Sequence, residues 1–265
     1  SSGGYLCLFT REIINNQYIY VDKTENIYRL IQGKYYFFSR PRRFGKSLTV
    51  STLQEIFSGN KELFKGLWIY DKIEWKQYPV IHIDFSVIGV KEIGTEQAIL
   101  KELENIAVKN GIQLTGTTPG AKFKELIQSL SKAEQVVILI DEYDKPIIDY
   151  IEDIPQAEKN REILKNFYSI LKGNDKYIKF LFITGVSKFS KVSIFSDLNH
   201  LNDITLNENY ATLTGYTEQE LDIYFSEYLQ LADDKLKEYF HSVRGAIKKW
   251  YNGYSWNGVD FVYNP

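Results

Sequence analysis

Residues 37–48 read "FFSRPRRFGKSL", and this segment is the strongest indication of the fold class. The apolar run predicts a β-strand over Tyr35–Ser39, and the residues that follow the loop predict a helix over Lys46–Phe57. A strand, a loop ending in Gly-Lys-Ser and a helix are the parts of a phosphate-binding loop. The loop departs from the pattern G-x-x-x-x-G-K-[ST], because Arg40 stands where the first glycine is expected. The stretch is therefore either a nucleotide site or a basic patch that contains Gly-Lys-Ser.

The residue types in this loop suit phosphate chemistry. Backbone N–H groups at the start of a helix point toward a bound phosphate, and the helix dipole favours its negative charge. Gly45 would let the backbone approach the phosphates, Lys46 would contact the β- and γ-phosphates and assist catalysis, and Ser47 would offer a hydroxyl to Mg²⁺. The expected cofactor-binding residues are Arg42, Arg43, Phe44, Gly45, Lys46, Ser47 and Leu48.

The two arginines before Phe44 leave alternatives open. Arg42 or Arg43 would add positive charge beside the phosphates or contact a neighbouring subunit. In the other interpretation both are solvated, or they pair with a carboxylate such as Asp144.

A second motif, "VVILIDEYDKP" at residues 136–146, ends an apolar strand over Val136–Ile140 in two carboxylates. The carboxyl ends of parallel strands face the crevice where α/β sheets bind ligands. Asp141 would hold Mg²⁺ through water, and Glu142 would polarise the water that attacks the γ-phosphate. A buried strand that ends in a solvated acidic turn is the alternative. The Gly-Lys-Ser loop upstream favours the nucleotide site.

A third strand, predicted over Ile178–Thr184, ends in "TGVSKFS". Thr184, ahead of Ser187, would contact the γ-phosphate or the attacking water as a catalytic sensor. Capping of a turn by these hydroxyls is the alternative. Asp84, at the end of another predicted strand, either supports the same crevice or caps the next turn.

Apolar strands that alternate with helices predict a parallel α/β sheet that is buried on both faces. The remaining strands are expected at Val80–Phe85 and Asp203–Leu206, and the helices between strands at Gln97–Asn110, Lys122–Ser131 and Ala157–Leu171. After Tyr210 the pattern changes. It predicts helices over Thr217–Leu229 and Asp233–Phe240, then an aromatic-rich hairpin over Trp250–Gly258. We expect a core over residues 1–212 and a helical lid over residues 213–265 that continues beyond Pro265.

Composition restricts the class of protein. The 265 residues carry a net charge of −2, so the whole chain has no basic footprint for nucleic acid. The longest apolar runs are far shorter than the roughly 20 residues that span a bilayer, so no membrane partner is expected. The single cysteine, Cys7, excludes an intramolecular disulfide, and with no visible secretory signal we expect a cytoplasmic protein. His82, His200 and His241 lack the spacing of a zinc site.

Long motifs carry a resemblance to a known family. The sequences "YVDKT" (20–24), "FFSRPRRFGKSL" (37–48), "ILIDEYDKPI" (138–147), "FITGVSKFSKVSIFSDLN" (182–199), "DITL" (203–206), "YATLTGYTEQEL" (210–221) and "WYNGYSW" (250–256) with "VYNP" resemble the AAA-ATPase-like family of prokaryotic P-loop proteins. The likeness covers nearly the whole chain. It implies that the arginine-containing loop is a family feature, and it implies a P-loop NTPase sheet of order 5-1-4-3-2 followed by a helical lid.

The resemblance also implies ATP and Mg²⁺ as cofactors. Many members continue into a nuclease-like domain of the PD-(D/E)xK type, which these 265 residues do not contain; such a domain would provide a protein or nucleic-acid partner. Related ATPases pass the segment around "YVDKT" over the adenine, so Asp22 and Lys23 would hold that segment, or Asp22 or Thr24 would cap a helix.

Three functions remain as hypotheses. The first is an ATPase that drives an effector or partner, with homo-oligomers expected. The second is a nucleotide-gated switch that hydrolyses ATP very slowly. The two functions differ in whether a neighbouring subunit supplies an arginine finger that accelerates hydrolysis, for which Arg161 and Arg244 are candidates. The third is a nucleic-acid-binding module that uses the patch Arg40–Arg43, against which the acidic net charge argues.

Overall fold

The structure is a computed structural model that describes residues 10–188, 194–196, 198, 200–236 and 242–265. Cys7 and His241 lie outside these residues, as does part of the predicted segment Asp233–Phe240. The central strands are β1 (Tyr35–Ser39), β2 (Val80–Asp84), β3 (Val136–Asp141), β4 (Ile178–Gly185) and β5 (Asn202–Asp203). The helices are α1 (Thr10–Asn15), α2 (Thr24–Ile31), α3 (Lys46–Phe57), α4 (Val90–Ile93), α5 (Thr95–Lys109), α6 (Pro119–Leu130), α7 (Lys145–Ile148), α8 (Ile154–Gly173), α10 (Glu218–Leu236) and α11 (Val243–Tyr251).

The central sheet has the strand order β2-β3-β4-β1-β5, and all neighbouring strands run parallel. A sheet can be counted from either edge, and counted from β5 the order is 5-1-4-3-2. The register aligns the carboxyl ends of the strands. Asp84 lies opposite Asp141, and Ser39 lies opposite Gly185. Chemically active side chains from separate motifs therefore meet at one edge of the sheet.

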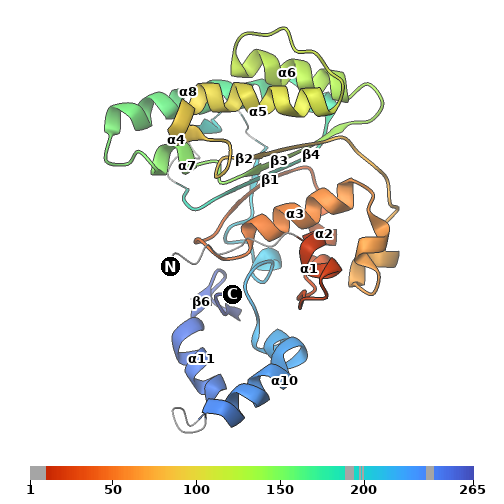
Figure 1. The fold of residues 1–265 in the computed structure, drawn as a ribbon, viewed down its shortest axis with the longest axis vertical. Helices are drawn as coiled ribbons and strands as arrows, with labels where there is room; N and C mark the ends of the chain where they lie inside the picture. The colour runs from red at the N-terminus through yellow and green to blue at the C-terminus, as the bar shows by residue number, and fades with distance from the viewer. Residues whose placement is uncertain (1–9, 189–193, 197, 199, 237–241) are drawn as a thin grey trace.

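Helices cover both faces of the sheet (Figure 1). Alternate residues of each strand face opposite sides, as the two-residue period of a strand requires. Phe37, Ile138 and Ile183 pack toward α5, α6 and α8, whereas Phe38, Leu139 and Phe182 pack toward α2 and α3. Because both faces are covered, the strands are almost continuously apolar. The sequence-based prediction of a parallel α/β sheet is confirmed.

The fifth strand is shorter than expected. The predicted strand Asp203–Leu206 overlaps β5 only at Asp203. Ladder pairing with β1 ends early because the side-chain hydroxyl of Thr205, and no backbone carbonyl, accepts the N–H of Ser39 at 3.1 Å. The backbone of residues 205–206 then turns away from the sheet.

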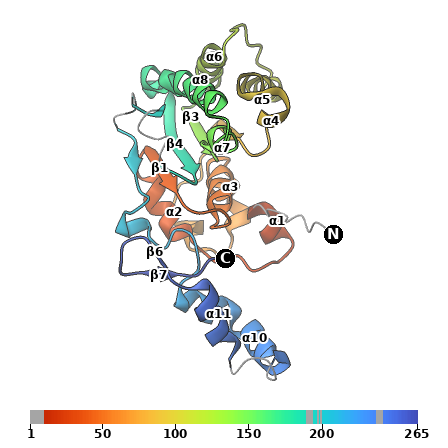
Figure 2. The same ribbon diagram turned by 90° about the vertical axis from the view of Figure 1, so that its left-hand side faces the viewer.

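The C-terminal region, residues 213–265, lies beside the core at the end where α3 begins (Figures 1 and 2). Its expected helix pattern is wrong in two places. One helix, α10, continues through Asp233, and a further helix, α11, covers Trp250 and Tyr251. The hairpin begins later, with β6 (Tyr254–Ser255) paired to β7 (Phe261–Val262). None of the helices in the described residues combines the length and apolar character needed to cross a bilayer.

Turn and cap chemistry explains the two C-terminal helices. At the start of α10, the hydroxyl of Thr217 accepts the N–H of Glu220 at 3.2 Å, and the Glu220 carboxylate accepts the N–H of Thr217 at 2.8 Å. This reciprocal pair is a capping box. At the start of α11, the Ser242 hydroxyl accepts the N–H of Gly245 at 3.1 Å, which satisfies one of the free donors of that helix.

Candidate functional site

The loop between β1 and α3 has a strained backbone. Arg43 has φ of 65° and Gly45 has φ of 81°, both in the left-handed region. A Cβ at Gly45 would come no closer than 4.0 Å to Thr214, so conformation and not space requires glycine there. A left-handed arginine is uncommon in proteins and costs about 1–3 kcal/mol, which the surrounding structure must offset. Strain of this kind at the start of a helix is a mark of a ligand-binding turn.

Lys46, the first residue of α3, is buried between this loop and the end of β3. Its ammonium group donates to the carbonyl oxygens of Arg40 at 3.1 Å and Pro41 at 3.0 Å. Burial lowers the pKa of Lys46, and the carboxylates of Asp141, Glu142 and Asp144 oppose that shift. The amine is thus the positive centre of an acidic crevice, as the sequence predicts for a group that contacts phosphate.

The strand-end carboxylate Asp141 is bound by Thr184. The Thr184 hydroxyl donates to Oδ1 of Asp141, and the backbone N–H of Glu142 donates to the same oxygen at 3.1 Å. Both side chains are buried. Both hydrogen bonds end on Oδ1 of Asp141, and neither of them uses Oδ2. The sequence placed Asp141 and Thr184 at neighbouring strand ends, and the structure brings them into direct contact.

Glu142 occupies a second strained position, with φ of 51°. Its backbone N–H also approaches the Thr184 hydroxyl at 3.3 Å. Burial raises the pKa of Glu142, and Asp141 raises it further, while Lys46 lowers it. A carboxylate with a raised pKa is a stronger base at neutral pH, which suits proton abstraction from water.

Asp144 is a site residue whose role sequence reasoning missed. Its buried carboxylate accepts the N–H of Val186 at 3.0 Å and both the N–H and the hydroxyl of Ser187, at 2.7 and 3.0 Å. Ser187, the second sensor candidate, is therefore used to fix the turn after β4. The short spacing of Asp144 from Glu142 was the available signal. Gly185, at the end of β4, must be a glycine, because a Cβ there would lie 2.4 Å from the ring of Tyr143.

Arg40 explains the departure from the expected glycine. The side chain is buried, with 1% of its surface exposed. Its guanidinium donates to the carbonyl oxygens of Ser39 at 3.0 Å and Thr205 at 2.6 Å. It also lies over the rings of Phe38, at 4.4 Å, and Trp256, at 4.2 Å. Burial lowers the pKa of Arg40 to about 9, so it keeps its charge at neutral pH.

The next arginines behave differently. Arg42 and Arg43 are exposed, and Arg42 lies close enough to lower the pKa of Lys46. The surface patch predicted over Arg40–Arg43 is therefore reduced to two residues, which weakens the case for a nucleic-acid module. Phe44 is fully buried and packs against Tyr254 at 4.8 Å between ring centroids. Ser47 and Leu48 are half-buried at the start of α3.

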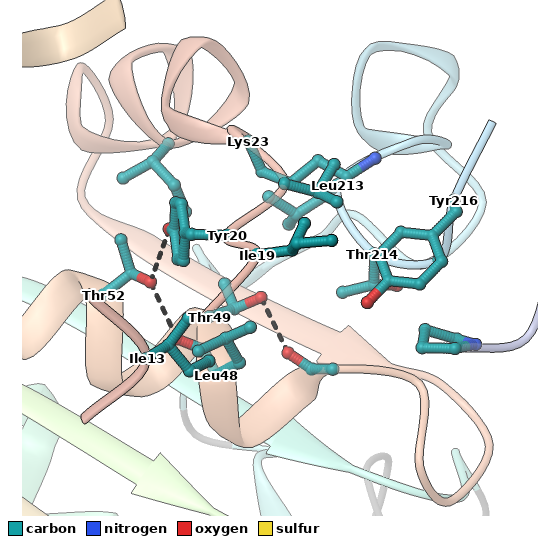
Figure 3. A pocket seen from close by; sticks show the side chains of 15 residues that line it. Ile13, Ile19, Tyr20, Lys23, Leu48, Thr49, Thr52, Leu213, Thr214 and Tyr216 are labelled. Atoms are coloured by element: carbon teal, nitrogen blue, oxygen red, sulfur yellow. Dashed lines mark hydrogen bonds between the residues drawn. The ribbon is translucent and has the colours of Figure 1, made fainter. Parts of the chain in front are cut away.

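A pocket lies beside the loop, between α3, the segment around "YVDKT" and the start of the C-terminal region (Figure 3). Its walls are mostly apolar, with Ile19, Leu48 and Leu213 among them. The Thr214 hydroxyl lines the pocket, is buried and has no hydrogen-bond partner in the described part of the chain. An apolar pocket with one unsatisfied polar group suits a flat heterocycle with a polar edge.

The segment "YVDKT" makes local contacts at the start of α2 and a long-range contact with α10. Asp22 accepts the N–H of Thr24 at 2.8 Å at the start of α2, which is the capping alternative, and it also accepts the N–H of Trp68 at 2.7 Å. Lys23 reaches across to α10, where its ammonium donates to both oxygens of Glu220 at 2.6 Å. The segment therefore joins the core to the C-terminal region along one wall of the pocket.

The remaining candidates lie at the edges of the site. Asp84 accepts the N–H of Ser86 at 2.8 Å, the turn-capping alternative, and burial raises its pKa, with a smaller contribution from Asp141. Arg244 pairs with Glu218 at 2.7 Å and also with Asp222, so it holds α11 against α10.

Mg²⁺ can be tested against these donors. No group of three or more His, Cys, Asp or Glu side chains within the described ranges is placed to share a metal ion. Mg²⁺ does not need one, because it binds through one or two protein oxygens, waters and substrate phosphates. The Asp141 carboxylate at the strand end and the Ser47 hydroxyl at the start of α3 are hard oxygen donors of this kind, so the residues fit Mg²⁺ brought by a phosphate ligand.

Comparisons with known proteins identify a family model and a relative that this chain resembles. A family model described as "Predicted AAA-ATPase" matches residues 9–195. A protein of Azotobacter chroococcum mcd 1, described as "Uncharacterized protein in vnfD 5'region", is 43% identical over 255 residues, which cover 94% of this chain and 47% of that protein. The chain thus spans about half the length of this curated relative. No solved structure matches the chain.

Proposed function

Because the chain belongs to the family of predicted AAA-ATPases, we propose that it is a P-loop ATPase that binds Mg-ATP at the loop after β1 and hydrolyses it. One observation supports the proposal: Lys46, at the start of α3, lies close enough to Asp141 for that carboxylate to raise its pKa, and the buried Thr184 on the neighbouring strand donates to Asp141. A cation, a strand-end carboxylate and a buried hydroxyl on adjacent elements are the parts that phosphoryl transfer uses.

The triphosphate would lie along the loop and the N-terminus of α3. Backbone N–H groups at Gly45 and Lys46 would donate to the phosphate oxygens, and the Lys46 ammonium would leave its carbonyl partners for the β- and γ-phosphates. Arg42 would add positive charge from the surface. Mg²⁺, held by Ser47 and through water by Asp141, would neutralise charge on the phosphates.

The base would occupy the apolar pocket of Figure 3. Leu48 and Leu213 would cover the faces of a purine, and the buried Thr214 hydroxyl would bond a polar edge. Gly45 of the loop lines the pocket, so the proposed sites for the base and for the phosphates adjoin each other. Residues from both the core and the C-terminal region line it, which supports a division near residue 212, with residues 213–265 acting as a lid.

Hydrolysis would depend on Glu142. Its carboxylate would accept a proton from the water that attacks the γ-phosphorus, while Thr184 fixes Asp141 and aligns the site. Phosphate departure would then change the contacts of the C-terminal region with the loop and drive an effector or partner. A slow switch is the second candidate. The observation in its favour is that Arg244, a candidate finger toward a neighbouring subunit, is paired with Glu218 and Asp222 of its own chain.

The test is ATP binding and Mg-dependent ATP turnover by the wild type, Glu142→Gln and Lys46→Ala. An ATPase requires turnover by the wild type, tight binding without turnover by Glu142→Gln, and weak binding by Lys46→Ala. Removing the base is expected to reduce turnover by about 10²–10⁴-fold. Binding by the wild type and by Glu142→Gln, with turnover by neither, supports the switch. An absence of ATP binding by the wild type would contradict both.

A further inference from the structure

We infer that the β6–β7 hairpin is part of the phosphate-binding site, and that Trp256 is the residue that positions the loop. This role rests on the proposed function, since the loop must first bind phosphate. It assigns to the hairpin the task that a glycine at position 40 performs in the common loop pattern, namely setting the path of the chain as it leaves β1.

The first contact holds the start of the loop. The guanidinium carbon of Arg40 lies 4.2 Å from the Trp256 ring centroid and 4.4 Å from that of Phe38, so the guanidinium contacts one ring of the hairpin and one ring of the core. Planar stacking is the geometry that arginine prefers with aromatic rings. The carbonyl oxygen of Arg40 in turn accepts a hydrogen bond from Lys46. A displacement of the Arg40 side chain would therefore move a partner of the phosphate-binding lysine.

The second contact holds the end of the loop. Phe44 is enclosed by Tyr254 at 4.8 Å and by Trp256 at 5.6 Å between ring centroids. Phe44 directly precedes the left-handed Gly45, so its burial fixes the backbone where helix α3 begins. The hairpin thus contacts the loop at its start, through Arg40, and at its end, through Phe44. The exposed Arg42 and Arg43 lie between these two contacts.

The hairpin is itself anchored close to the pocket. Tyr216 and Tyr263 exchange backbone hydrogen bonds of 3.1 and 2.7 Å, which tie β7 to the start of the C-terminal region. Nε of Arg40 and Nε1 of Trp256 are buried without hydrogen-bond partners among the described residues. Ring contact and burial, and no hydrogen bond from these two nitrogens to a described residue, hold Arg40 against Trp256. The environment of the indole therefore depends on the path of the loop.

The experiment measures Mg-ATP affinity by calorimetry for the wild type, Trp256→Ala, Trp256→Phe and the matched control Trp250→Ala. Trp250 lies on α11 and is 74% exposed. Loss of the stacked ring is expected to weaken binding about tenfold, the size of one good cation–aromatic contact. Trp256→Phe retains a ring over Arg40 and is expected to recover most of the affinity. Trp250→Ala is expected to bind as the wild type does.

A spectroscopic readout keeps the inference testable if Trp256→Ala does not fold. Mg-ATP is expected to change the tryptophan emission of the wild type, and the change is expected to be lost in Trp256→Phe and kept in Trp250→Phe. Wild-type affinity in a folded Trp256→Ala, or an identical emission change in Trp256→Phe, would overturn the role of the hairpin. These outcomes leave the ATPase proposal standing, because that proposal is judged on ATP binding and turnover by the wild type and not on the Trp256 variants.

Discussion

Thr184 donates its hydroxyl hydrogen to Oδ1 of Asp141, so one side-chain bond joins the carboxyl ends of β4 and β3. The two residues are buried beside Lys46, and neither has a role in the apolar core. The bond fixes the rotamer of the carboxylate that would carry the metal's water. Partners of this kind are worth about 10–100-fold in activity when they orient a metal-binding group.

Thr184→Val is therefore expected to lower ATP turnover by roughly 10-fold or more while it leaves ATP affinity within a few-fold. Valine keeps the shape of the side chain and removes the hydroxyl, which donates to Asp141 and accepts the N–H of Glu142. The matched variant Thr184→Ser keeps the donor and is expected to retain most of the activity. Steady-state kinetics measures the change in ATP turnover, and calorimetry measures the change in ATP affinity. Equal turnover by Thr184→Val and Thr184→Ser would exclude an orienting role of the hydroxyl.

Glu142 gives a prediction about pH. Its pKa is raised by burial and then by Asp141, and the carboxylate must be ionised to accept a proton. Turnover is expected to rise with pH through this raised pKa, above the ordinary glutamate value of about 4.3, and to level off beyond it. A pH profile that is flat down to the ordinary range would show that Glu142 is not the base.

The same shift predicts a stability effect. A carboxyl group whose pKa is raised by folding contributes stability below its unfolded pKa and loses that contribution as pH rises through the folded pKa. Glu142→Gln is thus expected to match or exceed the wild type in thermal stability at pH 7, and to lose that advantage in acid. A lower melting temperature of the variant at pH 7 would contradict this account.

Gly215 is required where the loop, β7 and the pocket meet. It has φ of 80°, and a Cβ there would lie 2.9 Å from the carbonyl oxygen of Tyr263 and 3.0 Å from the ring of Phe44. Gly215→Ala is expected to cost about 1–3 kcal/mol and to weaken ATP binding. The control is Gly173→Ala at the end of α8, where no atom lies within 4 Å and no change of that size is expected. Urea unfolding and calorimetry measure both, and equal behaviour of the two variants would contradict the prediction.

Lys23 and Glu220 connect the core to α10 with side chains only 12% and 18% exposed. Lys23→Ala leaves a half-buried carboxylate without its cation, so a loss of about 1–3 kcal/mol in unfolding free energy is expected. Arg29→Ala breaks the exposed pair with Glu25 and is expected to cost less than about 0.5 kcal/mol. Urea unfolding of the two variants compares them directly. A similar small effect of both would mean that the Lys23 contact does not fasten the C-terminal region.

Arg42 tests the charge beside the phosphates. Arg42→Ala is expected to weaken ATP binding a few-fold at low salt and less at high salt, because the side chain is exposed and screened. Arg43→Ala removes the second exposed arginine of the loop and is measured in the same way. Arg43 has a left-handed backbone conformation, which alanine must also adopt. Affinity that stays unchanged in both variants at every ionic strength would remove the arginines from the phosphate site.

The parallel sheet and the ends of its first four strands were predictable from sequence to within one residue, whereas β5 ends three residues before the predicted strand does. The strand Tyr35–Ser39 and the helix Lys46–Phe57 match β1 and α3 at both ends, because apolar runs and a Gly-Lys-Ser turn are local signals. The parallel arrangement follows from strands that are buried on both faces. Once the sheet is parallel, its carboxyl ends share an edge, so Lys46, Asp141 and Thr184 were expected near one another before any contact was known.

Tertiary structure alone decided what each group touches. Arg40 has the same residue type as Arg42, yet Arg40 is buried between Phe38 and Trp256 while Arg42 is exposed. No local pattern distinguishes them, because the difference comes from a hairpin more than two hundred residues later in the chain. Helix α11 escaped prediction for a related reason: the pairing of Arg244 with Glu218 on α10 adds tertiary contacts to the Ser242 cap, and no local pattern reveals those contacts.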